Sequence, residues 1–433
     1  MQKIHILIPL HTLPSIQSYK TIMFDNLLPA LRNKSNVYVT WIVYQADKLN
    51  SFLPNKYDES ILDIHSYDNA VKLLENIKPD IIYADATWDL IDYAFSSAGK
   101  FLNIPVIGGF ISDSKIIRKQ KTLVKLIIAR FFENSIPTDT DKNKKQFMRR
   151  GRFFIYKYIF LFKTLNATNL NTLKSIKKCL IILKLFLSIT SEHFDSRFAN
   201  TLHWLESESL VESLVKSGFD KSSLVVTGNP MLDESYEKIK QFKSPEKSDK
   251  IRVLLLPSTH YEHGFWTKKQ RDFVIGGIIR KILENKNHLE LIIKIHPSTA
   301  NISDYESLIS KMDQLIPVYQ TGQVLDYLNN ADVVISFWYG SAEVYSILAK
   351  KPLIFCNFFN DSPDDILQRE LVLECKEISS LVRTIDEVFL SNPASEQKRD
   401  KFIRESLGKW DGKASERISN AIITLLKKTS NHK

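Results

Sequence analysis

The sequence has little cysteine and no long uninterrupted apolar segment. Its three cysteines, Cys179, Cys356 and Cys375, lie far apart without metal-ligand spacing, which argues against a disulfide framework and a zinc site. No stretch approaches the roughly 20 apolar residues that a membrane-spanning helix needs. The first apolar run, residues 3–10, has no small-residue cleavage site after it, so we expect a β-strand and not a signal peptide. A cytoplasmic protein fits these features.

Acidic residues are scarce in one segment only. The chain carries a net charge of +10, and residues 115–165 contain 14 Lys and Arg against three acids. The remainder is therefore close to neutral, and the basicity belongs to this segment and not to the whole surface.

Strand and helix patterns alternate along most of the chain. At 433 residues the chain is too long for one ordinary core, so two domains are expected. The alternation predicts βαβ units and parallel sheets. We predict an N-terminal domain over residues 1–240, a polar linker over 241–250, a second domain over 251–378 and helices over 379–433. Within the first domain, residues 115–189 are expected to form a basic helical insertion, and residues 202–217 a helix.

Short polar motifs follow several predicted strands between Thr227 and Pro352. In an open α/β sheet, ligands bind beyond the carboxyl ends of the strands, and backbone N–H groups at helix starts favour phosphate. The motifs therefore predict a site for a nucleotide diphosphate. Their residues are Gly228 and Asn229, then Ser258, Thr259 and His260, then Lys294, His296 and Pro297, and finally Gly340, Ser341 and Glu343.

Each motif also has a plainer structural interpretation. Gly228 and Asn229 form a turn that we favour as a hinge over a direct ligand contact. Ser258 and Thr259 can donate hydrogen bonds to phosphate, and the His260 imidazole can stabilise a leaving diphosphate. A metal pair of His260 and His263 lacks a third ligand nearby, so no metal is expected.

His296 is the strongest single candidate. It alternates with Lys294 at the end of an apolar strand, which predicts both side chains on one side, and Pro297 ends that strand. Gly340 and Ser341 place N–H groups at a helix start, although Ser341 could simply cap the helix.

The runs VVTGNPMLD, VLLLPSTH, LIIKIHPST and ADVVISFWYGSAEVYSILAKKPLIF resemble the C-terminal half of GT-B glycosyltransferases. The resemblance covers residues 202–359 and is nearest to the surface-polysaccharide and CDP-glycerol glycerophosphotransferase-like group, with UDP-GlcNAc 2-epimerases as relatives. It implies an α/β GT-B fold, in which two Rossmann-like doubly wound domains face a cleft. It also implies that the His296-Pro297 pair contacts donor phosphate.

Two departures from the relatives bear on chemistry. Relatives usually place a ribose-binding acid one turn later than Glu343, and Lys350 stands where retaining enzymes often carry a second glutamate, which favours inversion. The epimerase branch needs a His-x-Glu-Ala-Gly element where this chain has Gly108-Gly109-Phe110, so epimerase chemistry is not expected.

The catalytic base should come from the N-terminal domain. His11, Asp85 and Asp113 follow predicted strands there, and His11 is placed first because it follows the first strand. No cofactor is expected beyond the nucleotide-activated donor, because His296 and helix dipoles would carry the leaving-group charge.

The segment 142–163 interleaves cations with Phe and Tyr. We rank an anionic membrane surface or a lipid-linked acceptor first, a solvated helix face second and nucleic acid third. The sequence therefore predicts a glycosyltransferase at the inner face of the cell membrane that transfers a sugar to a surface glycan or lipid-linked acceptor. A CDP-polyol phosphotransferase and a non-catalytic binding protein remain as alternatives.

Overall fold

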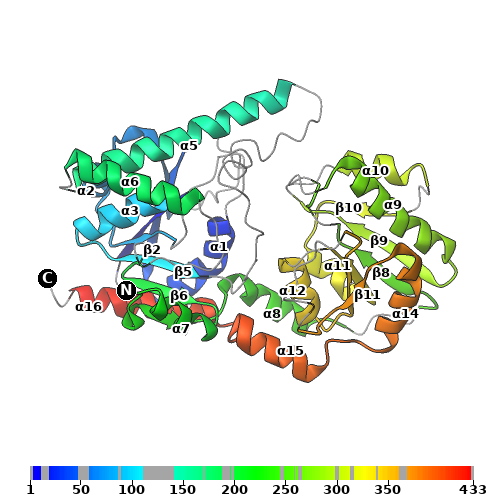
Figure 1. The fold of residues 1–433 in the computed structure, drawn as a ribbon. Coiled ribbons are helices and arrows are strands. Elements are labelled where there is room, and N and C mark those ends of the chain that lie inside the picture. Colours follow the sequence, from blue (N-terminus) through cyan, green and yellow to red (C-terminus); the bar gives the residue numbers. More distant parts are fainter. Residues whose placement is uncertain are drawn as a thin grey trace. The chain divides into compact units, whose positions relative to one another are not determined.

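The computed structural model of the chain is organised in two compact units (Figure 1). It describes residues 3–10, 19–46, 58–85, 89–110, 141–168, 171–187, 196, 199–243, 248–257, 259–261, 266–297, 302–312, 316–337, 340–359, 367 and 369–430, without the side chains of 110, 141–151, 183–187 and 430. The first unit comprises Met1–Glu234 with Arg404–Lys433, and the second comprises Ser235–Ile403.

The first unit is built on a seven-stranded parallel sheet of order β3-β2-β1-β4-β5-β6-β7. Its strands are β1 (Lys3–Pro9), β2 (Asn36–Val43), β3 (Glu59–Asp63), β4 (Ile81–Tyr83), β5 (Val106–Phe110), β6 (Leu202–Leu205) and β7 (Leu224–Val226). Its helices include α1 (Tyr19–Arg32), α2 (Ala70–Ile77), α3 (Leu90–Phe101), α5 (Asp141–Ala167), α6 (Thr172–Leu187), α7 (Ser209–Lys216) and α16 (Ala414–Ser430).

The alternation of side chains along β1 divides the core of this unit into two layers. Ile4, Ile6 and Ile8 pack with residues of α1 and α16, whereas Leu7 packs with residues of α2, α3, α5 and α6. Helices therefore cover both faces of the sheet, which explains why its central strands are apolar on both sides.

The second unit is built on a six-stranded parallel sheet of order β10-β9-β8-β11-β12-β13. Its strands are β8 (Ile251–Leu255), β9 (Leu289–Lys294), β10 (Val318–Tyr319), β11 (Val333–Ser336), β12 (Leu353–Cys356) and β13 (Leu373–Cys375). Its helices include α9 (Lys268–Glu284), α10 (Ile302–Ile309), α11 (Val324–Asn330), α12 (Ser341–Leu348), α14 (Leu381–Leu390) and α15 (Glu396–Phe402), while α8 (Asp233–Lys240) spans the boundary between the units.

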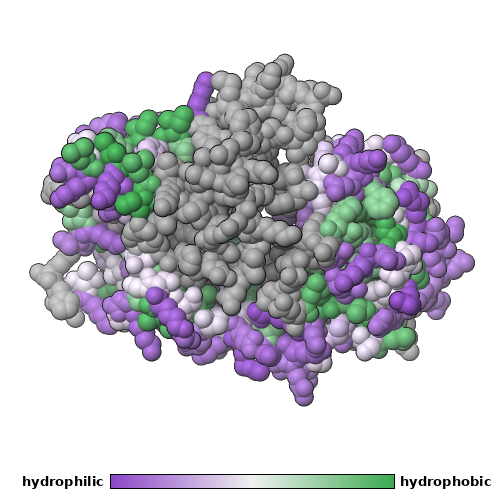
Figure 2. Space-filling view, in the orientation of Figure 1, coloured by the Kyte–Doolittle hydropathy of each residue, from purple (hydrophilic) through white to green (hydrophobic). Residues whose placement is uncertain are grey.

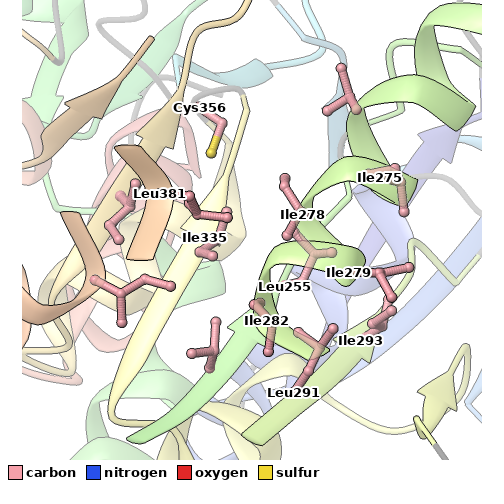
Figure 3. Packing of buried hydrophobic residues seen from close by; sticks show 14 of the residues in the cluster. Leu255, Ile275, Ile278, Ile279, Ile282, Leu291, Ile293, Ile335, Cys356 and Leu381 are labelled. Carbon is pink, nitrogen blue, oxygen red and sulfur yellow. The ribbon is translucent and has the colours of Figure 1, made fainter. Parts of the chain in front are cut away.

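Helix α9 supplies much of the second core (Figure 3). It begins at a capping box of Thr267 and Gln270. One apolar stripe of the helix packs against the central strands of the sheet, with the participating side chains Ile275, Ile278, Ile279, Ile282, Leu255, Leu291, Ile293 and Ile335. This packing fixes the strands whose ends carry the predicted motifs.

Two features differ from the sequence expectations. The segment 202–217 is not one helix, because the buried residues Leu202–Leu205 form β6 before α7 begins. Strands β3 and β13 were not predicted. The tail is helical, and its helices are divided between the two cores: Leu381 and Ile385 of α14 belong to the second core, whereas α16 packs into the first.

The basic insertion is helical where it is described, as α5 and α6, and residues 111–140 lie outside the description. No helix in the described ranges has both the length and the apolar character to cross a membrane.

Candidate active site

Three of the predicted motifs meet at one edge of the second sheet. Strand β8 pairs in parallel with β9 on one side and β11 on the other, so Leu255 lies beside both Ile293 and Ile335. Because parallel strands end at the same edge, the segments after β8, β9 and β11 come together there, about 5 Å from strand to strand. This β8–β9–β11 edge is also the point where the strand order reverses, the usual ligand position in such sheets.

The segment after β8 is held by aromatic packing. The His260 ring stacks on Trp266 at 4.7 Å between centroids, and Trp266 meets Phe337 edge-on. The backbone N–H of Trp266 also donates to the backbone carbonyl of His260 at 3.1 Å. His260 is therefore buried, while Thr259 is half-buried, and Ser258 and His263 lie outside the described residues.

The two polar residues at the end of β9 occupy different environments. Lys294 is buried, its ammonium donates to the carbonyls of Ile295 at 2.9 Å and Gln320 at 3.0 Å, and burial lowers its pKa. It therefore ties the end of β9 to the segment after β10. His296 and Pro297 are exposed, so His296 is the member of this motif that a ligand can reach.

The start of α12 is organised by Glu343. Its buried carboxylate accepts hydrogen bonds from the Ser336 hydroxyl and, at 2.8 Å, from the Gly340 N–H, and burial raises its pKa. Gly340 is the N-cap, so the plain expectation that Ser341 caps the helix is wrong. Ser341 is instead the first helical residue, and it is exposed. Glu343 thus fixes the helix start and leaves the Ser341 side chain accessible.

In the first unit, Asp85 follows β4 at the point where β1 and β4 adjoin and the strand order reverses. Asp85 is 3% exposed, and its carboxyl group accepts a hydrogen bond from the Tyr83 hydroxyl and lies 3.9 Å from the Lys20 ammonium. Burial raises the pKa of Asp85 well above its usual range, and the charges of Asp92 and Asp89 add to this. His11 and Asp113 lie outside the described residues.

Lys20 and Asp92 lie beside the candidate base Asp85, and sequence reasoning missed both. The Lys20 ammonium lies 2.5 Å from Asp92 and 2.8 Å from the Pro9 carbonyl at the end of β1. The signal was available, because Lys20 shares the buried stripe of α1 with Phe24 and Leu27. A charged residue on an apolar helix face indicates a buried partner.

A second layer of polar residues supports the chain before Asp85. The Asn200 amide donates to the Ala84 carbonyl at 2.7 Å and accepts from Ser96 at 2.6 Å. The Asn200 backbone N–H donates to the His203 ring at 2.7 Å, which requires an unprotonated acceptor nitrogen. Burial accordingly lowers the pKa of His203 to about 3, with a smaller contribution from Lys100.

Gly228 and Asn229 lie in the first unit and contact other residues of that unit. The Asn229 side chain donates to Glu206 at 3.1 Å and accepts from the Met231 N–H at 2.9 Å. Gly228 has φ +83°, and a Cβ there would lie 2.7 Å from the Lys409 carbonyl. The turn thus lies just before α8 and contacts the Lys409 segment of the same unit.

The described aromatic residues of the segment 142–163 pack into the first core. Phe153 and Phe160 are buried together with Leu161, and Tyr156 and Phe162 pack against them. These aromatic residues therefore contribute to the core of the first unit. Side chains before Arg152 in α5 are outside the description.

No protein-family model matches the sequence, and neither does any curated protein. Solved structures match over nearly the whole chain. A UDP-GlcNAc 2-epimerase from Neisseria meningitidis bound to UDP-GlcNAc is 14% identical with a TM-score of 0.51, covering 99% of this chain and 100% of that one. The calicheamicin glycosyltransferase CalG4 is 11% identical with a TM-score of 0.53, covering 99% of each chain. A variant of the wall teichoic acid polymerase TagF is 13% identical with a TM-score of 0.51, covering 99% of this chain and 90% of that one.

These likenesses establish the fold. The chain has the α/β GT-B fold, with two Rossmann-like units, as the sequence predicted.

Proposed function

We propose that this protein is a glycosyltransferase that uses a nucleotide-activated donor. The observation that carries the proposal is the β8–β9–β11 edge. There the exposed His296 follows β9 and the exposed Ser341 follows β11, on either side of β8, and Glu343 fixes the helix start at Ser341. Support comes from the GT-B fold, whose structural neighbours here include a glycosyltransferase and an epimerase bound to UDP-GlcNAc.

In the proposed reaction, the second unit binds the phosphates of the donor. His296 donates a hydrogen bond to the leaving phosphate, and the Ser341 hydroxyl and the positive end of the α12 dipole stabilise its charge. Thr259 adds a further hydroxyl. These groups favour departure of the nucleotide because the charge that they stabilise grows during bond cleavage.

The first unit would supply the base. Asp85 is the described candidate, because it follows β4 where the strand order of the first sheet reverses, the usual ligand position in such sheets. The resulting alkoxide would attack the donor carbon and invert it. The acceptor is a surface glycan or a lipid-linked sugar. His11 and Asp113 remain candidates for the same role.

Transfer of a polyol phosphate from a CDP donor is the second candidate function. The likeness to the TagF polymerase favours it, and the same edge would hold the phosphates of either donor. Epimerization is disfavoured because β5 carries Gly108-Gly109-Phe110 where the epimerases need a His-x-Glu-Ala-Gly element. The third candidate function is that of a non-catalytic nucleotide-binding protein.

A thermal-shift screen against UDP, GDP, CDP, CMP and TDP tests the proposal. A nucleotide present at 100 times its Kd stabilises the native state by about 2.7 kcal/mol. Stabilisation by UDP or GDP, followed by nucleotide release from the matching sugar donor, supports a glycosyltransferase. Stabilisation by CDP or CMP favours polyol-phosphate or acidic-sugar transfer, and binding without turnover favours the non-catalytic protein.

His296→Ala is the sharpest variant, with His288→Ala as its control because both imidazoles are exposed in the same unit. We expect His296→Ala to weaken nucleotide binding by about tenfold or more, equivalent to about 1.4 kcal/mol, and the control to leave it unchanged. Undiminished binding by His296→Ala would show that the phosphate assignment is wrong.

A further inference from the structure

Helices α5 and α6 present large aliphatic side chains to solvent. On α5 these are Ile155 and Ile159, 56% and 47% exposed, and on α6 they are Leu173, Ile176 and Leu180, 77%, 43% and 55% exposed. The spacings of four residues on α5 and of three and four on α6 place each set in one stripe. We call these five residues the aliphatic face.

The two stripes belong to one surface. On α6, Lys178 lies over the Tyr93 ring of α3 at 5.6 Å, so this side of the helix faces α3. Ile176 and Leu180 are each two residues away and therefore lie on nearly the opposite side. Cys179 of α6 is buried in the same cluster as Phe160 of α5, so the helices pack together. Figure 2 shows hydrophobic residues gathered where α5 and α6 run in Figure 1.

The charge around this face is predominantly positive. From Arg152 to Ile182 the chain has six Lys and Arg and no acid. Two of these cations pair with acids of other segments, Lys157 with Asp89 at 2.6 Å and Lys163 with the exposed Asp68 at 3.8 Å. Arg152, Lys174 and Lys177 are exposed. Their aliphatic stems can extend along the apolar surface while the charges reach outward. A partner that covers this surface must therefore accept aliphatic groups and carry negative charge around them.

We infer that the aliphatic face docks on a lipid bilayer that contains anionic headgroups. Aliphatic side chains with a predominantly basic surround are the composition of helices that lie in a membrane interface. Anionic lipids attract such basic residues. A helix that lies in the membrane interface buries only its apolar face in the bilayer. The aromatic residues from Phe153 to Phe162 lie in the core or pack against it, so the proposed contact is made by the aliphatic side chains of α5 and also by those of α6.

Co-sedimentation of the full chain with vesicles tests this inference. The vesicles contain phosphatidylcholine alone or mixed with phosphatidylglycerol. We expect binding to the mixed vesicles and at least tenfold weaker binding to phosphatidylcholine alone. The triple variant Ile159→Gln, Leu173→Gln, Leu180→Gln should lower binding to mixed vesicles at least tenfold. The double variant Lys174→Glu, Lys177→Glu should do the same, and added salt should weaken the wild type.

Matched controls are available in the second unit. Phe389 and Leu390 of α14 are 46% and 83% exposed, so Phe389→Gln with Leu390→Gln removes exposed apolar surface elsewhere. Lys268→Glu with Lys269→Glu reverses exposed charge on α9. Both controls should sediment like the wild type. Because all substituted residues are exposed, their melting temperatures should stay close to that of the wild type.

Three outcomes would overturn the inference. The first is a wild type that fails to bind mixed vesicles, and the second is a triple variant that binds them like the wild type. The third is a wild-type dimer in light scattering that the triple variant converts to a monomer without a change in sedimentation, which would assign the face to a second copy. None of these outcomes depends on nucleotide binding, so failure of the proposed function would be seen separately.

Discussion

The ammonium of Lys20 and a carboxylate oxygen of Asp92 lie 2.5 Å apart with both side chains fully buried. The same ammonium lies 3.9 Å from Asp85. One cation therefore faces two carboxyl groups at the carboxyl ends of β1 and β4. This arrangement links the charge of the candidate base to residues on two helices, α1 and α3.

Removal of the cation should destabilise the first unit. Lys20→Met leaves the Asp92 charge buried without its ammonium partner, which typically costs about 3–5 kcal/mol. The double variant Lys20→Met, Asp92→Leu removes both charges and should recover most of that loss. Urea unfolding followed by circular dichroism measures both. A loss below about 1 kcal/mol for Lys20→Met would contradict a buried ion pair.

Asp85→Asn should stabilise the protein at neutral pH while abolishing transfer. Because burial raises the folded-state pKa of Asp85 above its unfolded value, its contribution to stability is present at low pH and is lost as pH rises through the folded pKa. The loss is about 1.4 kcal/mol for each unit by which the pKa is raised.

The asparagine side chain does not titrate. The melting temperature of the Asp85→Asn variant should therefore exceed that of the wild type by more at pH 8 than at pH 5. Asp58→Asn, an exposed acid of the same unit, serves as the control and should show no such pH-dependent difference. Full transfer activity in Asp85→Asn would remove Asp85 as the base and leave His11 and Asp113.

His203 should make the first unit sensitive to acid. Its folded pKa of about 3 lies below the ordinary value of 6.5, because burial disfavours the imidazolium. Stability is therefore complete above about pH 6.5 and falls as pH decreases towards 3, by up to about 1.4 kcal/mol per pH unit. His203→Gln lacks this titration and should give a flatter profile of unfolding free energy between pH 4 and pH 7. Parallel profiles for the two proteins would exclude His203 as the titrating group.

The sequence predicted the fold more completely than the site. Apolar runs and turn residues identify β1, β8 and β9, and parallel pairing then places their ends at common edges. The contacts within the site depend on residues distant in sequence, as in the pair of Lys20 and Asp92. The same holds for Lys294, whose ammonium donates to the Gln320 carbonyl. Local patterns identify which residues end a strand, but not which neighbours will satisfy their polar groups.

The segment 202–217 shows the corresponding limit for secondary structure. Leu202–Leu205 is a run of four buried residues next to an amphipathic helix, and so short a run does not distinguish strand from helix. Its strand conformation is set by pairing with β5 and β7, which is tertiary information.

Gly228→Ala should destabilise the turn that precedes α8 more than an equivalent change elsewhere. Gly228 has φ +83°, and a Cβ there would meet the backbone carbonyl of Lys409 at 2.7 Å. Gly322 has nearly the same φ, +81°, but its Cβ would meet the Tyr327 hydroxyl at 2.9 Å, at the end of a side chain that can move.

Both alanines therefore carry the left-handed backbone strain of roughly 1–3 kcal/mol, and only Gly228→Ala also displaces backbone. Arg417 holds the turn and the Lys409 segment together, because its guanidinium donates to the Thr227 carbonyl at 2.7 Å and to the Lys409 carbonyl at 3.5 Å. Neither part can therefore move aside easily to make room for a Cβ. We expect thermal unfolding to show the larger loss for Gly228→Ala. Equal losses in the two variants would mean that the Lys409 segment shifts freely, and the turn would then not fix the point at which the chain leaves the first unit.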